Sequence, residues 1–413
     1  MTKTKEIFLK ILKNSFHPEM ASPAELESAL MGEGTDWESV LNVAKKQNLF
    51  PFVYDTVTGY PAFSDFDAAN PDNFMFTTLD VSAQMQRTEA FLHLYQAFLS
   101  HNLMPIVMKG IICRSLYGEK ADFRPSGDED ILIEKRDYVK AVEILEACGY
   151  QKEADPDAKM TIIQEVTFHS ENLTVELHLN PFGLQSAMRE KMNDWFRNVF
   201  RSEETVEIKG VQIRTMTPTD HFLFLVFHAF KHFIGGGFGV RMMLDILLFV
   251  EKYEKRIDWA YVSRGMNDIG ATGFYADLVE LGNRYLAFSL SQKYIPVCPA
   301  ELLDDMFQMG IFGNSTGTDR TAGRMVADTV QKGRKHYNNK IMTYIRLLFP
   351  SRKTWYSWQP YLKDKPWMIL PEWFRRIGRF MRGESSTRDM SGLDKSYHIA
   401  EKRIDLLKKY GVL

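Results

Sequence analysis

Residues 124–133 read Arg124-Pro-Ser-Gly-Asp-Glu-Asp-Ile-Leu-Ile133, a turn followed by acidic residues and an apolar run. The turn and the apolar residues after it predict a short strand over Asp128–Ile133. Side chains two residues apart on a strand project from the same face, so Asp128 and Asp130 project together and Glu129 projects away. Two adjacent carboxylates repel each other unless a cation lies between them. Because Mg²⁺ favours oxygen ligands, the pair predicts a site for Mg²⁺ or Mn²⁺.

A third carboxylate follows in a second predicted strand. In Leu173–Leu179 apolar residues alternate with Thr, Glu and His, which is typical of a half-buried strand. Its polar face carries Glu176 and His178. If this strand lies beside Asp128–Ile133, three carboxylates meet at one edge of a sheet, as in sites where two metal ions promote attack on phosphorus. His178 would then orient Glu176 or lie on the surface of the strand.

The segment before the acidic strand predicts a place for an anion. Met104–Met108 is a short apolar run that predicts a strand, and Ile111–Tyr117 predicts a helix. Gly110, between them, lets a phosphate approach the backbone, and the N-terminus of a helix attracts anions. Lys109 lies next to this site, where it either reaches a phosphate or only flanks the strand.

The rest of the pattern divides the chain into three segments. Residues 1–80 predict helices, with Asp36 as a helix cap and a loop over 60–74. Residues 81–215 predict a compact α+β unit with a mixed sheet. Residues 216–413 predict a large helical domain that begins at Thr217, a residue suited to capping. The other elements expected are helices over Val81–His101, Tyr138–Cys148 and Arg241–Tyr253, and strands over Met160–Phe168, Thr205–Ile208 and Val211–Thr215.

The composition is that of an ordinary globular chain. Of 413 residues, 45% are apolar and 25% charged, and the net charge is -2. A net charge near zero does not favour a nucleic-acid partner. Cys113, Cys148 and Cys298 form no zinc-binding pattern, so we expect reduced, buried thiols. The sequence shows neither a signal peptide nor a stretch that would span a membrane, and we expect a cytoplasmic protein.

Taken in order, the motifs resemble those of a known family. Lys109-Gly110, Tyr117-Gly118, Arg124-x-x-x-Asp-x-Asp130 and Glu176-Leu-His178 are similar to the motifs of an uncharacterised bacterial nucleotidyltransferase-like family. That family lies within the polymerase-β-like nucleotidyltransferase superfamily, and the resemblance spans about residues 85–250. It implies a nucleotidyltransferase-like core that moves a nucleoside monophosphate from an NTP to a hydroxyl, with pyrophosphate leaving.

The resemblance also implies residue roles. Asp128, Asp130 and Glu176 would be the catalytic residues and the metal ligands. The residues expected to contact the nucleotide are Lys109, Gly110, Arg124, Ser126 and Gly127. Those expected to line a pocket for an unknown acceptor are His178, His228, Lys231, His232, Arg241 and Asp245.

Two positions depart from the superfamily pattern. The glycine is usually followed by Ser or Gly, but here by Ile111, and the residue between the aspartates is usually apolar, but here is Glu129. These departures motivate an alternative, a catalytically degenerate protein that keeps the fold as a binding or interaction module.

Several charged side chains allow two interpretations. Arg124 either clamps a phosphate or pairs with an acid such as Asp128. Arg241 and Asp245 are four residues apart, which predicts an ion pair along one helix face, with a place in the acceptor pocket as the alternative.

Three histidines, His221, His228 and His232, share one predicted helix face. We expect them to pack or to face the substrate, and a zinc site is the alternative.

Residues 332–382 are locally basic and contain Trp355, Trp358, Trp367 and Trp373. We expect the aromatic residues to pack and the basic groups to be solvated. The alternative is contact with a membrane surface or a polyanion.

Overall fold

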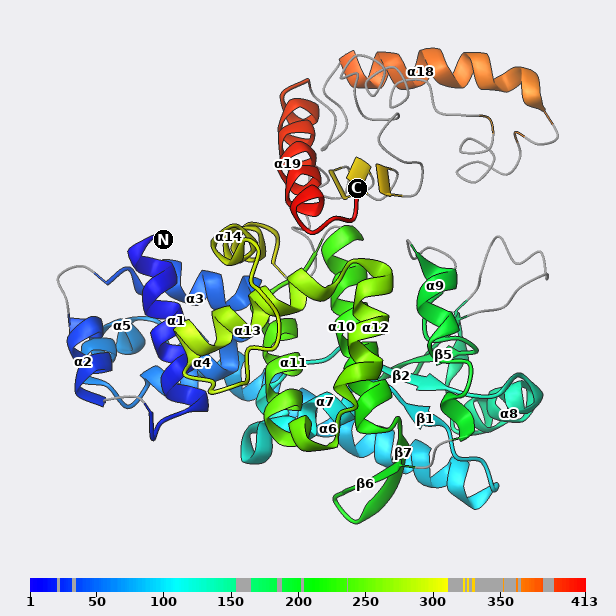
Figure 1. Cartoon of the computed structure of the whole chain (residues 1–413), viewed down its shortest axis with the longest axis horizontal. Helices are drawn as coiled ribbons and strands as arrows, with labels where there is room; N and C mark the ends of the chain where they lie inside the picture. The colour runs from blue at the N-terminus through cyan, green and yellow to red at the C-terminus, as the bar shows by residue number, and fades with distance from the viewer. Residues whose placement is uncertain are drawn as a thin grey trace.

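The structure is a computed structural model of the chain. It describes residues 1–20, 23–31, 35–153, 165–183, 188–201, 204–235, 237–310, 322–323, 325–326, 329–330, 352, 362, 365–381 and 390–413. The fold is α+β, with a mixed sheet between helical segments, as the sequence predicts (Figure 1).

The described residues form a seven-stranded sheet in the order β3-β4-β5-β2-β1-β7-β6. The strand β2 pairs antiparallel with β1 and parallel with β5, so the two acidic strands are neighbours, as the site prediction requires. The strand β4 pairs antiparallel with β5, and β6 pairs antiparallel with β7. The strands are β1 (Ile106–Val107), β2 (Asp128–Leu132), β3 (Gln151–Lys152), β4 (Glu165–His169), β5 (Thr174–His178), β6 (Glu204–Ile208) and β7 (Val211–Thr215).

Helices cover both faces of this sheet. On one face α6 (Asp72–Ser100) and α8 (Tyr138–Ala147) share a hydrophobic cluster with alternate strand residues such as Ile131 and Val175. On the other face α10 (Pro218–Gly235) and α11 (Val240–Tyr253) share a second cluster that includes Leu132. Because strand residues alternate, the even-numbered positions of β2, which include both aspartates, lie on the side of α10.

The N-terminal helices share this second cluster with the C-terminal helices. The helix α1 (Lys3–Phe16) packs against α3 (Trp37–Lys46), α4 (Phe50–Val57) and α13 (Thr272–Leu286). The predicted cap at Asp36 is confirmed, since its carboxylate accepts the Ser39 N–H at 2.9 Å.

The predicted loop over 60–74 is wrong. The helix α5 (Pro61–Ala69) occupies most of it, and α6 begins at Asp72. Pro61 lies in the first turn, where the missing N–H costs nothing. The Phe63 side chain is buried and the Trp37 indole N–H donates to the Ala62 carbonyl at 3.1 Å. Tertiary burial therefore stabilises a helix where the local composition favours a turn.

The remaining helices mostly follow the predicted pattern. Thr217 caps α10, because its hydroxyl accepts the Asp220 N–H at 3.2 Å. The predicted α-helix over Ile111–Tyr117 is shorter: α7 ends at Arg114 and continues as a 3₁₀ helix, η1 (Ser115–Phe123). The other helices are α2 (Pro23–Met31), α7 (Ile111–Arg114), η2 (Lys135–Asp137), α9 (Arg189–Asp194), η3 (Val199–Arg201), η4 (Glu254–Arg256), α12 (Trp259–Ile269), α14 (Pro299–Met309), η7 (Pro366–Met368), α18 (Ile369–Met381) and α19 (Met390–Lys409).

The cysteines are free, but they are not all buried. Cys113 and Cys298 are buried, whereas Cys148 is exposed because it follows the last residue of α8 at the surface. Within the described residues, none of the helices combines the length and the apolar character that crossing a membrane requires.

Candidate active site

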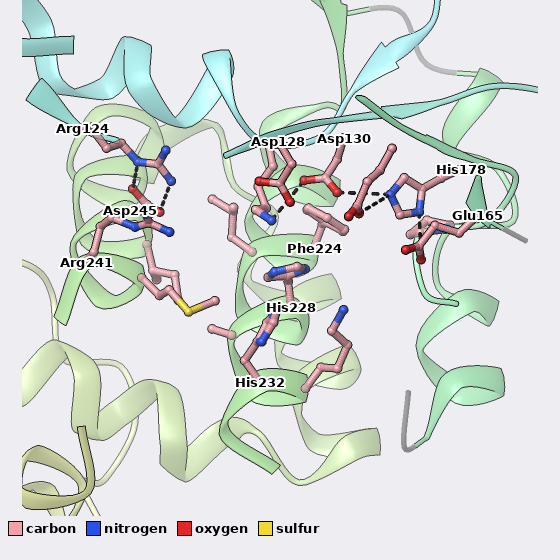
Figure 2. Close-up of a pocket in the computed structure, with 18 residues that line it drawn as sticks. Arg124, Asp128, Asp130, Glu165, His178, Phe224, His228, His232, Arg241 and Asp245 are labelled. Atoms are coloured by element: carbon pink, nitrogen blue, oxygen red, sulfur yellow. Dashed lines mark hydrogen bonds and ion pairs between the residues drawn. The ribbon is translucent and has the colours of Figure 1, made fainter. Parts of the chain in front are cut away.

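The three predicted carboxylates meet at the edge shared by β2 and β5. In the parallel register Asp130 lies opposite Glu176, and Asp128 lies two pairs earlier, opposite Thr174. Asp130, Glu176 and His178 each offer a ligand atom within 4.8 Å of the others. Asp128 lines the same cavity, which has a volume of about 260 Å³ (Figure 2). Strand alternation and parallel pairing thus bring all three acids to one cavity.

Two cationic groups already face these acids. The Lys109 ammonium lies 3.0 Å from Asp130, and the His178 ring lies 3.1 Å from Asp130 and 3.4 Å from Glu176. Burial opposes the charge of Asp130, but Lys109 and His178 outweigh it and hold the pKa of Asp130 well below its usual value. Burial likewise lowers the pKa of His178, yet its hydrogen bonds to Asp130 and Glu176 raise that pKa to about 9.

The negative charge of Glu176 is only partly balanced by neighbouring cations. The hydrogen bond from His178 lowers its pKa, but burial and the charges of Asp130 and Asp128 outweigh that bond and raise the pKa above its usual value. Its side chain is 26% exposed, against 5% for Asp130. The cluster therefore holds more negative charge than its protein partners neutralise, and Glu176 and Asp128 are half-buried whereas Asp130 is buried.

The donor set fits a divalent cation. Carboxylate oxygens from Asp128, Asp130 and Glu176 are the hard ligands that Mg²⁺ takes, and the repulsion that raises the pKa of Glu176 is relieved by a cation. His178 suits Mn²⁺ better than Mg²⁺ as a direct ligand.

Glu165 belongs to the site and was missed at the sequence level. It lies on β4 opposite His178, lines the cavity, and its carboxylate is 3.7 Å from the His178 Nδ1 (Figure 2). At this distance the contact is an ion pair and not a hydrogen bond, and the His178 Nδ1 has no hydrogen-bond partner among the described residues. The alternation Glu165, Thr167, His169 along the predicted strand was the available signal, since it places Glu165 on a polar face.

The phosphate cradle predicted at Gly110 is filled by the protein itself. A Cβ on Gly110 would lie 1.9 Å from the Glu129 carboxylate, which also accepts the Ile111 N–H at 2.8 Å. Glu129 is buried and pairs with Arg114 at 2.6 Å. The Glu129 side chain therefore caps the start of α7. Position 110 requires glycine because Glu129 packs against it and because its φ is positive.

Ser126 also makes internal contacts. Its hydroxyl accepts from Arg114, and its N–H donates to the Gln84 side chain at 2.8 Å. Neither Ser126 nor Gly127 lines the cavity, whereas Lys109 and Arg124 do. A nucleotide contact of Gly110, Ser126 and Gly127 stays a prediction, and it would require these internal contacts to change.

Arg124 pairs with Asp245 and not with Asp128. Its guanidinium donates to both Asp245 oxygens, at 2.7 and 2.6 Å (Figure 2). The Tyr117 hydroxyl also donates to Asp245, at 2.8 Å. The predicted ion pair between Arg241 and Asp245 is therefore wrong. Arg241 instead donates to the Pro125 carbonyl at 2.5 Å. The bidentate pair fastens η1 and its following turn to α11.

The wall opposite the carboxylates comes from α10 and α11. His228, Lys231 and His232 line it from α10 and Arg241 from α11. The rings of His228 and His232 lie 4.5 Å apart between centroids. Burial, together with Lys109 and Lys231, lowers the pKa of His228 well below its usual value.

The sequence predicts His221 on the same helix face as these histidines, but its environment in the structure is different. Its ring lies 3.1 Å from the Thr215 hydroxyl and packs 5.0 Å from the Phe249 ring. Among the described residues, the metal-competent group of acids and histidines contains none of His221, His228 and His232. The structure thus gives no support to the zinc alternative.

Comparison with known proteins agrees with this geometry. The model of a family described as "Uncharacterised nucleotidyltransferase" matches residues 33–287. The chain belongs to this family. The match is wider than the resemblance seen in the motifs, because it includes α3–α5 before the sheet and α12 and α13 after it. Curated proteins and solved structures gave no match.

The family match ends before the basic segment 332–382. Most of that segment, including Trp355 and Trp358, lies outside the described residues. Trp367 is 66% exposed and Trp373 packs partly against Leu362 and Ile369. The division into segments 1–80, 81–215 and 216–413 stays a prediction, and the family match crosses both of its boundaries.

Proposed function

We propose that this chain is an active nucleotidyltransferase that moves a nucleoside monophosphate from an NTP to a hydroxyl acceptor. The observation that carries the proposal is the cluster of Asp128, Asp130 and Glu176 on paired strands, in one cavity of a chain from a nucleotidyltransferase family. A buried cluster of like charges is unfavourable by itself and is expected where a cation and phosphates bind.

Asp128, Asp130 and Glu176 would hold Mg²⁺. When bound, the metal neutralises charge on the phosphates and on the oxygens that enter and leave. Lys109 and His178 hold Asp130 in place, and Glu165 lies at ion-pair distance from His178 and favours its charged form. Glu176 is the acid with the greater access to the cavity, so it is placed to take the proton of the acceptor hydroxyl.

The proposed reaction is a single displacement at the α-phosphorus of the NTP. The acceptor oxygen forms a bond to the α-phosphorus and passes its proton to Glu176. The bond between that phosphorus and the bridging oxygen breaks, and pyrophosphate leaves with the electron pair.

The test is metal-dependent nucleotide binding, which needs no knowledge of the acceptor. Calorimetry would titrate each non-hydrolysable NTP analogue into the full chain, with Mg²⁺ and with EDTA. We expect Mg²⁺ to tighten binding at least tenfold, and Asp128→Asn with Asp130→Asn to abolish this gain. Asp137→Asn, in η2 after the end of β2 and outside the cavity, is the matched control. Once an acceptor is found, the double variant should lose turnover by about a thousandfold, as expected for lost electrostatic stabilisation.

A second candidate function rests on the capped start of α7. Glu129 occupies the space beside Gly110 where a phosphate was predicted to bind. In this second candidate the space stays filled, and the fold serves as a binding module without catalysis. NTP binding that is indifferent to Mg²⁺, or absent, would favour this candidate over the transferase.

A further inference from the structure

The cavity beside the carboxylates has a second wall of the opposite charge. His228, Lys231 and His232 are three and four residues apart on α10, so they share one helix face, and Arg241 reaches the cavity from α11. In Figure 2 the two histidine rings lie below Asp128 and Asp130, across the opening, with Arg241 on the side of Asp245. We call these four residues the cationic wall, after Lys231 and Arg241. Burial lowers the pKa of His228 and of His232 well below its usual value, so the two histidines contribute neutral hydrogen-bonding groups.

The cationic wall has unused hydrogen-bonding groups. His228 is only 8% exposed, and its Nε2 has no hydrogen-bond partner in the part of the chain that the structure describes. The same holds for Nε of Arg241, which is 9% exposed. No carboxylate of the described residues lies within ion-pair distance of Lys231. A buried cation or polar nitrogen without a partner is unfavourable, so this wall is suited to an anion.

The cavity offers an anion few other anchors. The backbone N–H at the start of α7 is already bonded to Glu129, and the Ser126 hydroxyl is bonded to Arg114. The guanidinium of Arg124 is bonded to Asp245 through two nitrogens, and its third nitrogen, Nη1, is buried without a hydrogen-bond partner among the described residues. Phosphate oxygens would therefore find cationic groups with unused donors mainly on the wall of α10 and α11, with the Arg124 Nη1 beside it.

We infer that the cationic wall binds the triphosphate tail of the nucleotide, in place of the turn after β1. The inference rests on the proposed function and adds the side of the cavity on which the tail lies. The α-phosphate is then next to the carboxylates of β2 and β5, and the outer phosphates extend towards α10. Lys231 supplies a compact charge and Arg241 supplies further donors, both of which suit phosphate oxygens.

The test uses inorganic tripolyphosphate as the probe, in EDTA, with the full chain. We expect wild type to bind it and Lys231→Gln to weaken binding about tenfold, because the variant removes a charged hydrogen-bond donor. Lys231→Arg should retain most of the affinity, because it keeps the charge. Lys255→Gln, an exposed lysine in η4, is the matched control and should bind as wild type does. His228→Leu gives a second probe of the wall, and circular dichroism confirms that each variant is folded.

A competition experiment assigns the anion to the nucleotide. A non-hydrolysable NTP analogue should displace the tripolyphosphate. If both bind together, the wall belongs to the acceptor and the inference is wrong. It is also wrong if wild type does not bind tripolyphosphate, or if Lys231→Gln binds it unchanged.

The two proposals fail in different ways. Asp128→Asn with Asp130→Asn should leave tripolyphosphate binding in EDTA intact, because these acids face the metal. If Mg²⁺ has no effect on NTP binding while Lys231→Gln still weakens tripolyphosphate binding, the metal-dependent function is wrong and the anion site stands.

Discussion

Two clusters of buried charge lie on opposite sides of one cavity and differ in how their charges are matched. In the Asp245 cluster, one carboxylate accepts two hydrogen bonds from Arg124 and one from Tyr117. In the carboxylate cluster, the described cationic groups within ion-pair distance of Asp130 and Glu176 are Lys109 and His178. Both oxygens of Asp245 are therefore bonded within the protein, whereas the carboxylate cluster keeps an excess of negative charge that a cation would neutralise.

The difference shows how buried charge divides between structure and function. A buried ion pair is stable when its geometry is good and its remaining polar atoms are bonded. The Asp245 carboxylate meets this condition, since both of its oxygens accept hydrogen bonds, and the pair joins η1 to α11; the Arg124 Nη1 has no hydrogen-bond partner among the described residues. The carboxylate cluster concentrates like charges, which lowers stability in the free protein and makes cation binding favourable. The same element, β2 with its preceding turn, contributes to both.

The largest expected effect breaks the Asp245 cluster. Asp245→Ala leaves Arg124 buried without its partner, and we expect a loss of about 3–5 kcal/mol in the free energy of unfolding. Denaturant titration measures it. The control is Asp55→Ala, which removes an exposed pair with Lys120 at 2.7 Å and should cost less than about 1 kcal/mol. Similar losses in the free energy of unfolding for both variants would contradict the difference between the buried pair and the exposed pair.

The next effect concerns a buried histidine with no opposing charge. Burial outweighs a hydrogen bond to the Met108 carbonyl and lowers the pKa of His221 from 6.5 to about 4. Between these values the unfolded chain binds a proton that the folded chain does not, so stability falls as the pH decreases through this window. The fall amounts to at most about 3 kcal/mol, at 1.4 kcal/mol for each pKa unit.

The comparison that isolates His221 is wild type against His221→Gln at pH 7 and pH 4.5. Other groups titrate in both proteins, so the informative quantity is the difference between their free energies of unfolding. This difference should shrink by a few kcal/mol on acidification. Two parallel stability curves would show that His221 carries no such penalty.

The smallest expected effect is a gain in stability in the carboxylate cluster. Because its neighbours raise the pKa of Glu176, its charge is unfavourable at neutral pH. Glu176→Gln keeps an acceptor for His178 and should stabilise the protein in EDTA by about 0.5–1 kcal/mol. Asp130→Asn is the counterpart: it should destabilise, since Lys109 and His178 hold the pKa of Asp130 low. Thermal unfolding in EDTA measures both variants, and stabilisation by Asp130→Asn would contradict the assignment of charges.

Local sequence pattern predicted much of the fold and the site. The alternation in β2 and β5 placed Asp128, Asp130 and Glu176 on the correct faces, because a strand has a fixed period of two. The pattern failed where a residue's partner is distant. Asp245 pairs with Arg124, 121 residues away, and not with its helix neighbour Arg241. The loop predicted over 60–74 became α5 because Phe63 is buried against other helices.

The sequence by itself determined which chemical groups the site contains: three acids (Asp128, Asp130 and Glu176) and two basic groups (Lys109 and His178). Strand and helix periodicity make their positions neighbours. Only the tertiary structure decided which charges satisfy one another. In the folded protein Glu129 accepts the Ile111 N–H, and Arg124 donates to Asp245. The cationic wall on α10 and α11 faces the carboxylates. The reason is physical: periodicity is a property of the local backbone, whereas the partner of a buried charge is set by the packing of elements far apart in the chain.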